Sequence, residues 1–212
     1  MTAGHVFWCN VFKWLYDTTS SAGQHGRFGI GAVNTLATMC VCVYIYDSFN
    51  SSGELLLSRS HLAPIKKRTI PQLELAAAAL IAETVALLRP IIDVPVQRWL
   101  LFSDSTVTLH RIIKGVNGRH DTYVLARLRI ISEKTKSQDW FYIPSENNPA
   151  DLLTRGMSIK ELIDHELWYH GPTGAKLDSA IRDTPRLLNR PELSDALINL
   201  VVKESSALDH EE

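Results

Sequence analysis

The order of apolar and polar residues predicts strands in the first part of the chain. Residues 5–16 are apolar and aromatic and predict a first strand. Residues 41–46 and 54–60 are two further strand-like runs, and the turn sequence between them predicts a β-hairpin. Residues 18–34 are rich in Gly, Ser and Thr, so they indicate a loop or an insertion between the first strand and the hairpin.

The next segment predicts a long helix. Thr69 and Gln72 have the spacing of a capping box, and Pro71 is compatible with the first turn of a helix. A helix over residues 70–88 would stop before the next proline. Glu74 shares one face of this helix with five apolar residues, which are Ala77, Ala78, Ile81, Val85 and Leu88. We therefore expect Glu74 to point toward the core.

Shorter elements alternate in the second half of the chain. The expected elements are a buried strand over residues 97–102, a helix from about Ser105, a helix over 122–134, a short strand over 140–143, a helix capped by Asn148, and a helix from Ser158 to Trp168. Beyond Pro172 we expect a peripheral helical or partly flexible tail. The order of elements predicts an α/β fold in which a mixed sheet is flanked by helices.

Composition and charge limit the classes of protein to which the chain can belong. The 212 residues, 45% hydrophobic and 21% charged, fit one globular domain of moderate size with extensions. Residues 1–156 carry 16 Lys and Arg against 12 Asp and Glu, whereas residues 157–212 carry 6 against 11, so the body is basic and the tail acidic. A basic stretch over residues 108–136 is explained equally by phosphate binding and by a solvated helical face.

The cysteines and apolar runs indicate a cellular compartment. Cys9, Cys40 and Cys42 are an odd number without the paired spacing of a zinc site. Cys40 and Cys42 alternate on a predicted strand, and we expect buried free thiols in a reducing compartment. The N-terminus lacks a signal-peptide pattern, and the apolar run over residues 36–46 is shorter than the ~20 residues that span a bilayer. These patterns predict an intracellular protein without a membrane partner.

Three short segments each place one carboxylate where burial or a helix terminus is expected. They are Pro71-Gln72-Leu73-Glu74-Leu75, Phe102-Ser103-Asp104-Ser105 and Asn147-Asn148-Pro149-Ala150-Asp151. Asp104 follows a predicted buried strand, and ligands of open α/β sheets collect at the carboxyl ends of strands. Each acid alone is explained equally well by the helix dipole or by capping. Together they indicate a cation site, because buried carboxylates are costly unless a cation binds them.

The same segments, in the same order, resemble a known family. The motifs are Ser60-His61-Leu62-Ala63-Pro64-Ile65-Lys66-Lys67-Arg68-Thr69-Ile70-Pro71-Gln72-Leu73-Glu74-Leu75, Ser103-Asp104-Ser105, Ile143-Pro144-Ser145-Glu146-Asn147-Asn148-Pro149-Ala150-Asp151-Leu152 with Thr154-Arg155-Gly156, and Leu167-Trp168-Tyr169-His170-Gly171-Pro172. Over residues 40–172 they closely resemble the ribonuclease H domain of BEL/Pao-type retrotransposon polyproteins. The resemblance implies a ribonuclease H-like fold and, in active members, metal-dependent cleavage of the RNA strand of RNA/DNA hybrids.

The resemblance also implies a set of site residues. Glu74, Asp104 and Asp151 fall on three of the four metal-binding acids of the family, so the implied cofactor is a pair of Mg²⁺ ions about 4 Å apart, with Mn²⁺ as the alternative. The fourth acid of the family ends the first strand. Counting back from the second strand, that place holds Val33 or Asn34; if residues 18–34 are an insertion, Asp17 would supply the acid instead.

These observations give two alternative functions. The first is a retroelement-derived enzyme that hydrolyses the RNA strand of RNA/DNA hybrids, with the reverse transcriptase and integrase segments of a polyprotein as ancestral partners. The second is a catalytically incomplete remnant that at most binds nucleic acid or serves as an interaction domain. We expect residues 1–34 to be an N-terminal strand with an insertion, residues 35–157 to form the ribonuclease H-like domain, and residues 158–212 to form a helical, acidic extension.

Overall fold

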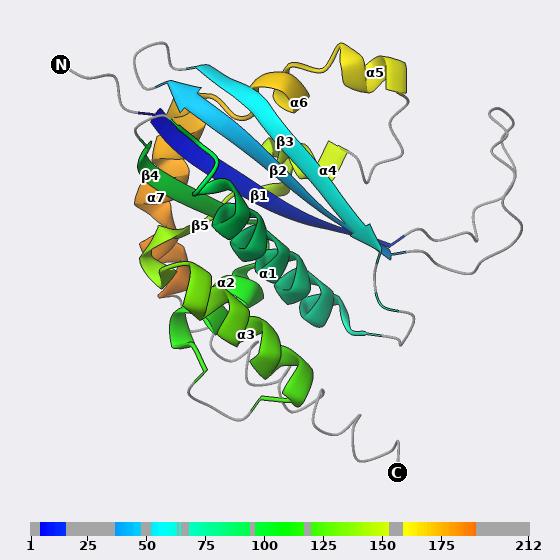
Figure 1. Cartoon of the computed structure of the whole chain (residues 1–212), viewed down its shortest axis with the longest axis vertical. Coiled ribbons are helices and arrows are strands. Elements are labelled where there is room, and N and C mark those ends of the chain that lie inside the picture. Colours follow the sequence, from blue (N-terminus) through cyan, green and yellow to red (C-terminus); the bar gives the residue numbers. More distant parts are fainter. Residues whose placement is uncertain are drawn as a thin grey trace, which may run out of the picture.

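A computed structural model describes residues 5–15, 37–47, 52–62, 64, 68–93, 96–116, 120–152 and 159–189. Its centre is one five-stranded sheet with the strand order β3-β2-β1-β4-β5 (Figure 1). The strands are β1 His5–Leu15, β2 Ala37–Asp47, β3 Ser52–Leu62, β4 Val96–Ser103 and β5 Trp140–Tyr142. The predicted hairpin is confirmed, since β2 and β3 pair in antiparallel fashion from Thr38 opposite Leu62 to Asp47 opposite Ser52, with a register shift between Val43 and Tyr44.

The directions of the strands decide where a site can form. β1 pairs with β2 in antiparallel fashion, whereas β1, β4 and β5 run parallel to one another. The sheet is therefore mixed, as the order of elements predicts. Because β4 and β5 end on the same side, the segments that follow them begin at one common edge of the sheet.

The helices follow the local signals of the sequence closely. They are α1 Ile70–Leu88, α2 Thr106–Lys114, α3 Thr122–Lys134, α4 Pro149–Leu152, α5 Ile159–Ile163, α6 Glu166–His170 and α7 Gly174–Leu188. In the capping box of α1, the Gln72 N–H donates to Thr69 Oγ1 at 3.4 Å and the Thr69 N–H donates to Gln72 Oε1 at 3.1 Å. The predicted bounds of α1 and of α3 are confirmed.

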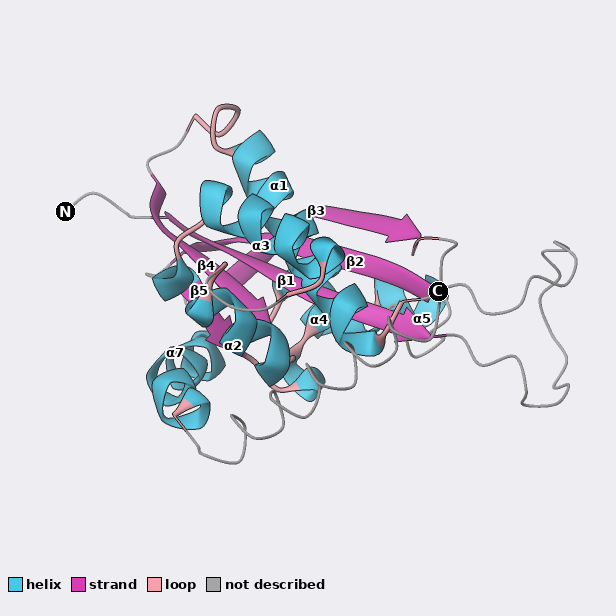
Figure 2. Cartoon of the chain, turned by 90° about the horizontal axis from the view of Figure 1, so that it is seen from below, coloured by secondary structure: helices cyan, strands magenta, loops and turns pink. Residues whose placement is uncertain are grey.

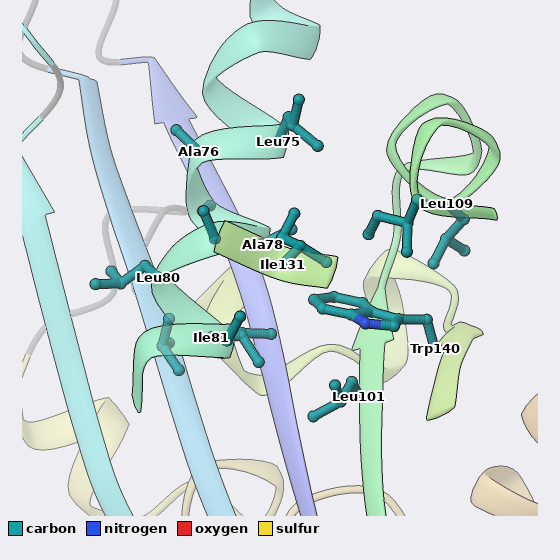
Figure 3. Close-up of a cluster of buried hydrophobic side chains, with 14 of the residues drawn as sticks. Leu75, Ala76, Ala78, Leu80, Ile81, Leu101, Leu109, Ile131 and Trp140 are labelled. Atoms are coloured by element: carbon teal, nitrogen blue, oxygen red, sulfur yellow. The ribbon is translucent and has the colours of Figure 1, made fainter. Parts of the chain in front are cut away.

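Two hydrophobic clusters fill the two faces of the sheet. The first joins α1, α2 and α3 to the sheet through residues such as Leu75, Ile81, Leu109, Ile131 and Trp140, whose side chains converge in Figure 3. The second lies under α4, α6 and α7 and includes Cys40 and Cys42 as buried thiols outside any disulfide, which confirms that part of the prediction. Figure 2 shows the sheet between these helical layers.

α1 is the core helix of the first cluster. Among the described helices, α1 is long and apolar enough to cross a membrane by length and composition alone. However, 67% of its apolar window is buried inside the fold, as expected of a helix that packs on a sheet.

α7 is not the peripheral tail that the sequence predicts. Leu177 and Ala180 of α7 are buried against the sheet, and the Tyr142 N–H of β5 donates to Thr184 Oγ1 at 2.8 Å. The Thr184 hydroxyl in turn donates to the Ala180 carbonyl at 2.6 Å. Since β5 is the last strand of the sheet, α7 supplies the acceptor that a further strand would otherwise provide.

One predicted helix is also wrong. The segment expected to form a single helix from Ser158 to Trp168 contains two short helices, α5 and α6, which are separated at Asp164 and His165. The cap predicted at Ser158, the motif at residues 154–156 and the predicted insertion at residues 18–34 lie outside the described residues. β1 is part of the same sheet as β2–β5, and the predicted division into three regions stays a prediction.

Candidate functional site

Glu74 lies near the start of α1, where the capping box fixes the first turn. Its side chain is half-buried, and its Oε2 accepts a hydrogen bond of 2.7 Å from Ser105 Oγ. The capping residue Gln72 also donates from Nε2 to Asp121 Oδ2 at 2.8 Å, which ties α1 to the N-terminus of α3. The position of Glu74 is therefore set both by its helix and by the segment that follows β4.

Ser105 is the link between β4 and α1. Its hydroxyl oxygen accepts the Thr108 N–H at 3.1 Å as the N-cap of α2, while its own N–H donates to Ser103 Oγ at 3.1 Å. The hydroxyl proton is then free to point at Glu74. Because the Ser105 hydroxyl accepts one hydrogen bond and donates another, it holds the carboxylate of Glu74 close to the end of β4.

Asp104 lies between Ser103 and Ser105, directly after β4 ends. Burial raises the pKa of Asp104 from its ordinary value of 3.8 to about 6, the hydrogen bond from Ser145 opposes this rise, and the negative charges of Glu74 and Asp151 add to it. Ser145 Oγ donates to Asp104 Oδ2 at 3.1 Å. Asp104 is thus a carboxyl group whose charge is disfavoured by its surroundings.

Asp151 is supplied by α4, whose start is built as predicted. Pro149 is the first helical residue, and Asn148 Oδ1 accepts the Ala150 N–H at 3.0 Å. The Asp151 N–H donates to the Asn148 carbonyl at 3.0 Å, and the Asp151 side chain is buried. A short capped turn therefore orients this acid against the sheet.

The three predicted acids interact, although they are contributed by α1, the end of β4 and α4. The charges of Glu74 and Asp151 both act on the pKa of Asp104. Within the part of the chain that the structure describes, no three acidic, histidine or cysteine side chains are arranged closely enough to hold one metal ion. The acids form an electrostatically coupled group, and the hydroxyls of Ser105 and Ser145 occupy part of its hydrogen-bonding capacity.

β1 is the strand expected to end with the fourth acid. Its parallel pairing with β4 ends at Val11 opposite Ser103, after Asn10 opposite Phe102. No residue from His5 to Leu15 is Asp or Glu. Asn10 and Val11 are therefore the β1 residues level with the end of β4, and neither carries a carboxylate.

The count that placed the fourth acid at Val33 or Asn34 assumed that the first strand ends there. The first strand instead ends at Leu15, while Asp17, Val33 and Asn34 all lie outside the described residues. β1 continues four residues past Val11, or roughly 13 Å at the rise of an extended strand. The backbone register places Asn10 and Val11 opposite Phe102 and Ser103, the two residues directly before Asp104.

Ser105, Ser145 and Tyr142 lie around the acids but are not among the predicted site residues. Ser105 and Ser145 belong to the quoted motifs. For Tyr142, on the predicted strand over residues 140–143, the sequence favours core packing over base stacking. Burial raises the pKa of Tyr142, and the charges of Asp104 and Glu146 raise it further, which locates its hydroxyl near the acids.

A basic corner lies at the N-termini of α1 and α3. The Arg68 Cζ is 4.1 Å and the Arg127 Cζ is 3.5 Å from the centre of the Tyr123 ring, so one ring is in contact with two guanidinium groups. In the described part of the chain neither guanidinium forms an ion pair with a carboxylate, and the Nε of Arg68 is buried without a hydrogen-bond partner. Arg68 precedes Glu74 by six residues, and the N-cap Thr69 of α1 lies between them.

The mixed sheet, its flanking helices and its group of acids define a ribonuclease H-like α/β domain. Residues 33–105, about a third of the chain, match the family described as Pao retrotransposon-like RNaseH-like domain. This match confirms the resemblance seen in the motifs and includes Glu74 and Asp104, whereas Asp151 lies beyond it.

Other comparisons add little to this assignment. The crystal structure of the NurA nuclease from Sulfolobus solfataricus aligns with 68% of this chain and 48% of the nuclease, at 13% identity and a TM-score of 0.30. The aligned part is therefore about half the length of that nuclease. Comparison with curated proteins gives no significant match.

Proposed function

We propose that this ribonuclease H-like domain of a BEL/Pao-type retroelement hydrolyses the RNA strand of RNA/DNA hybrids, with Glu74, Asp104 and Asp151 as its metal-binding acids. The observation that carries the proposal is that separate elements meet at the end of β4: Ser105 joins Glu74 of α1 to this end at 2.7 Å, Ser145 donates to Asp104 at 3.1 Å, and the charge of Asp151 of α4 acts on Asp104. Acids in such a group are stable in their charged forms when a cation joins them. The reverse transcriptase and integrase segments of a polyprotein are the partners that this origin implies.

The chemistry of the donors suits Mg²⁺, although the three described side chains are not close enough to hold one ion together. All three side chains offer carboxylate oxygens, which are the ligands that Mg²⁺ prefers, and Mn²⁺ accepts the same donors. When bound, Mg²⁺ would supply Lewis-acid activation of water and neutralisation of charge on the scissile phosphate.

The chain itself positions the reacting groups. Ser105 holds the carboxylate of Glu74 and Ser145 holds that of Asp104, so both acids are oriented before any ligand arrives. Arg68 and Arg127, whose guanidinium groups lie against the Tyr123 ring, are suited to phosphates of a bound strand. Binding would depend mainly on the backbone of the nucleic acid and would weaken as salt rises.

A second candidate function is nucleic-acid binding without cleavage. The observation that favours it is the absence of Asp and Glu from β1, where Asn10 lies level with the end of β4. An amide cannot supply the negative charge that an ionised carboxylate gives to a metal site. On this reading the three remaining acids would bind a cation weakly, while the basic corner would still bind nucleic acid.

One experiment separates the two candidates. The purified chain is incubated with a labelled RNA/DNA hybrid and Mg²⁺, in parallel with Asp104→Asn and Asn10→Asp. The proposed enzyme cleaves the RNA strand, and Asp104→Asn lowers the rate by orders of magnitude because a metal ligand is lost. If the chain binds the hybrid without cleaving it and Asn10→Asp gains Mg²⁺-dependent cleavage, the second candidate is correct. Cleavage that is unaffected by Asp104→Asn would remove the proposed site.

A further inference from the structure

A groove of about 660 Å³ runs between α7 and the segment that follows β5. We call it the α7 groove. Tyr142, Pro144 and Asn147 form one wall, and the other wall is the stretch of α7 that includes Lys176, Ser179 and Arg186. None of the metal-binding acids proposed above lines the groove.

The α7 groove begins where the acidic group ends. Tyr142 lines the groove, and its pKa is raised in part by the charge of Asp104. Ser145, between the two groove residues Pro144 and Asn147, donates its hydroxyl proton to Asp104. A nucleic-acid strand that passes the acids can therefore continue into the groove over the segment between β5 and α4.

The lining has the chemistry of a single-strand binding groove. Lys176 and Arg186 are exposed cations at the two ends of the α7 wall. The acidic lining residue Asp183 lies 3.8 Å from the Arg182 guanidinium, which offsets part of its charge. Most of the exposed lining is apolar, and an apolar surface beside an aromatic ring accepts the faces of bases whatever their sequence.

The dimensions agree with a short stretch of nucleic acid. Lys176 and Arg186 are ten residues apart on one helix, or roughly 15 Å of rise. At about 3.4 Å per nucleotide this length corresponds to about four nucleotides. Small side chains along α7, at Ala175, Ser179 and Ala180, leave the groove open between the two cations.

We propose that the α7 groove binds single-stranded nucleic acid that continues from the hybrid bound at the acids, with its phosphates on Lys176 and Arg186 and a base against Tyr142. This inference rests on the proposed function, since it assumes that a hybrid occupies the neighbouring site. The role of α7 would be to bind the single strand that continues beyond the duplex.

The test compares blunt RNA/DNA hybrids with hybrids that carry a short RNA overhang at either end. Binding is measured by fluorescence anisotropy in EDTA, so that no cleavage occurs. For the wild-type chain we expect one of the two overhangs to tighten binding roughly tenfold, the size expected from one stacked base and its phosphates. The slope of log affinity against log salt should also steepen for that overhang.

Two variants remove the proposed contacts without touching the acids. The double variant Lys176→Glu/Arg186→Glu reverses both phosphate contacts, and Ala175→Trp fills the groove from an exposed position. Both should abolish the advantage of the overhang and leave binding of the blunt hybrid unchanged. Lys160→Glu, an exposed cation on α5, is the matched control and should keep the advantage. Circular dichroism and melting temperature verify that each variant is folded.

The outcomes separate this inference from the proposed function. If the wild-type chain binds the blunt hybrid and neither overhang changes its affinity, the α7 groove does not bind a single strand and the proposed function is unaffected. The inference also fails if the overhang advantage survives in both variants. Failure to bind any hybrid would overturn the proposed function itself.

Discussion

The substitution Asp104→Asn should stabilise the metal-free domain at neutral pH, although it removes a proposed metal ligand. Asn keeps the shape of the side chain and an oxygen that can accept the Ser145 hydroxyl. The pKa of Asp104 rises from 3.8 to about 6, and one pKa unit corresponds to about 1.4 kcal/mol. The charged carboxylate therefore costs at most about 3 kcal/mol above pH 6, and we expect a gain of about 1–3 kcal/mol.

The pH dependence has a defined sign. Because the pKa of Asp104 is higher in the folded state, the folded chain binds more protons than the unfolded chain between pH 3.8 and about 6. The contribution of this group to stability is therefore greatest below pH 3.8 and declines as the pH rises through about 6. The difference in stability between Asp104→Asn and the wild type should grow across this window and be constant above it.

Urea denaturation followed by circular dichroism measures this difference directly. Titrations at several values from pH 4 to 7.5 in EDTA give the free energy of unfolding of both chains, and Asp178→Asn, an exposed acid on α7, is the control. Added Mg²⁺ should stabilise the wild type more than Asp104→Asn, since a ligand stabilises only the state that binds it. A variant that is less stable than the wild type at pH 7 in EDTA would show that the charge of Asp104 is already compensated within the fold.

Three further substitutions test the packing around the site by urea denaturation. Thr184→Ala should cost about 1–3 kcal/mol because the Tyr142 N–H loses its acceptor; Thr184→Ser keeps the hydroxyl and should retain most of the stability, and equal losses would contradict the edge role of α7. Ser105→Ala should cost about 1–2 kcal/mol through the lost N-cap of α2, and a change below about 0.5 kcal/mol would count against that cap. Gly53→Ala should cost about 1–3 kcal/mol, since the new methyl group would lie 2.5 Å from the His170 carbonyl oxygen; an unchanged stability would show that α6 can move away from β3.

The sequence predicts elements well where their ends are set by local chemistry. The bounds of α1 follow from Thr69, Gln72 and Pro71 together with the proline after the helix, all within a few residues of the ends they define. The N-caps Ser105 and Asn148 likewise fix the starts of α2 and α4. These hydrogen bonds join residues two or three positions apart, so a single sequence contains both partners in one motif.

The parts that the sequence does not predict depend on contacts between distant segments. The Tyr142 N–H meets Thr184 at a separation of 42 residues, and nothing near either residue indicates the other. The contact between Ser145 and Asp104 spans 41 residues in the same way. The place of the fourth acid also depends on pairing, because the β1 residues beside the end of β4 are Asn10 and Val11, whereas counting along the chain gave Val33 or Asn34.

The surroundings of Asp104 disfavour its charge. The hydroxyl of Ser145 and a backbone hydrogen bond favour the charged carboxylate of Asp104, whereas burial and the like charges of Glu74 and Asp151 oppose it. A neutral donor stabilises a carboxylate but cannot cancel the repulsion among three of them. A domain that retains such a group loses stability unless a ligand restores it, and stabilising mutations at such sites commonly cost function. The cost of charging Asp104 is what the proposed cation would offset, and a stability gain from Mg²⁺ that is lost in Asp104→Asn would support that proposal.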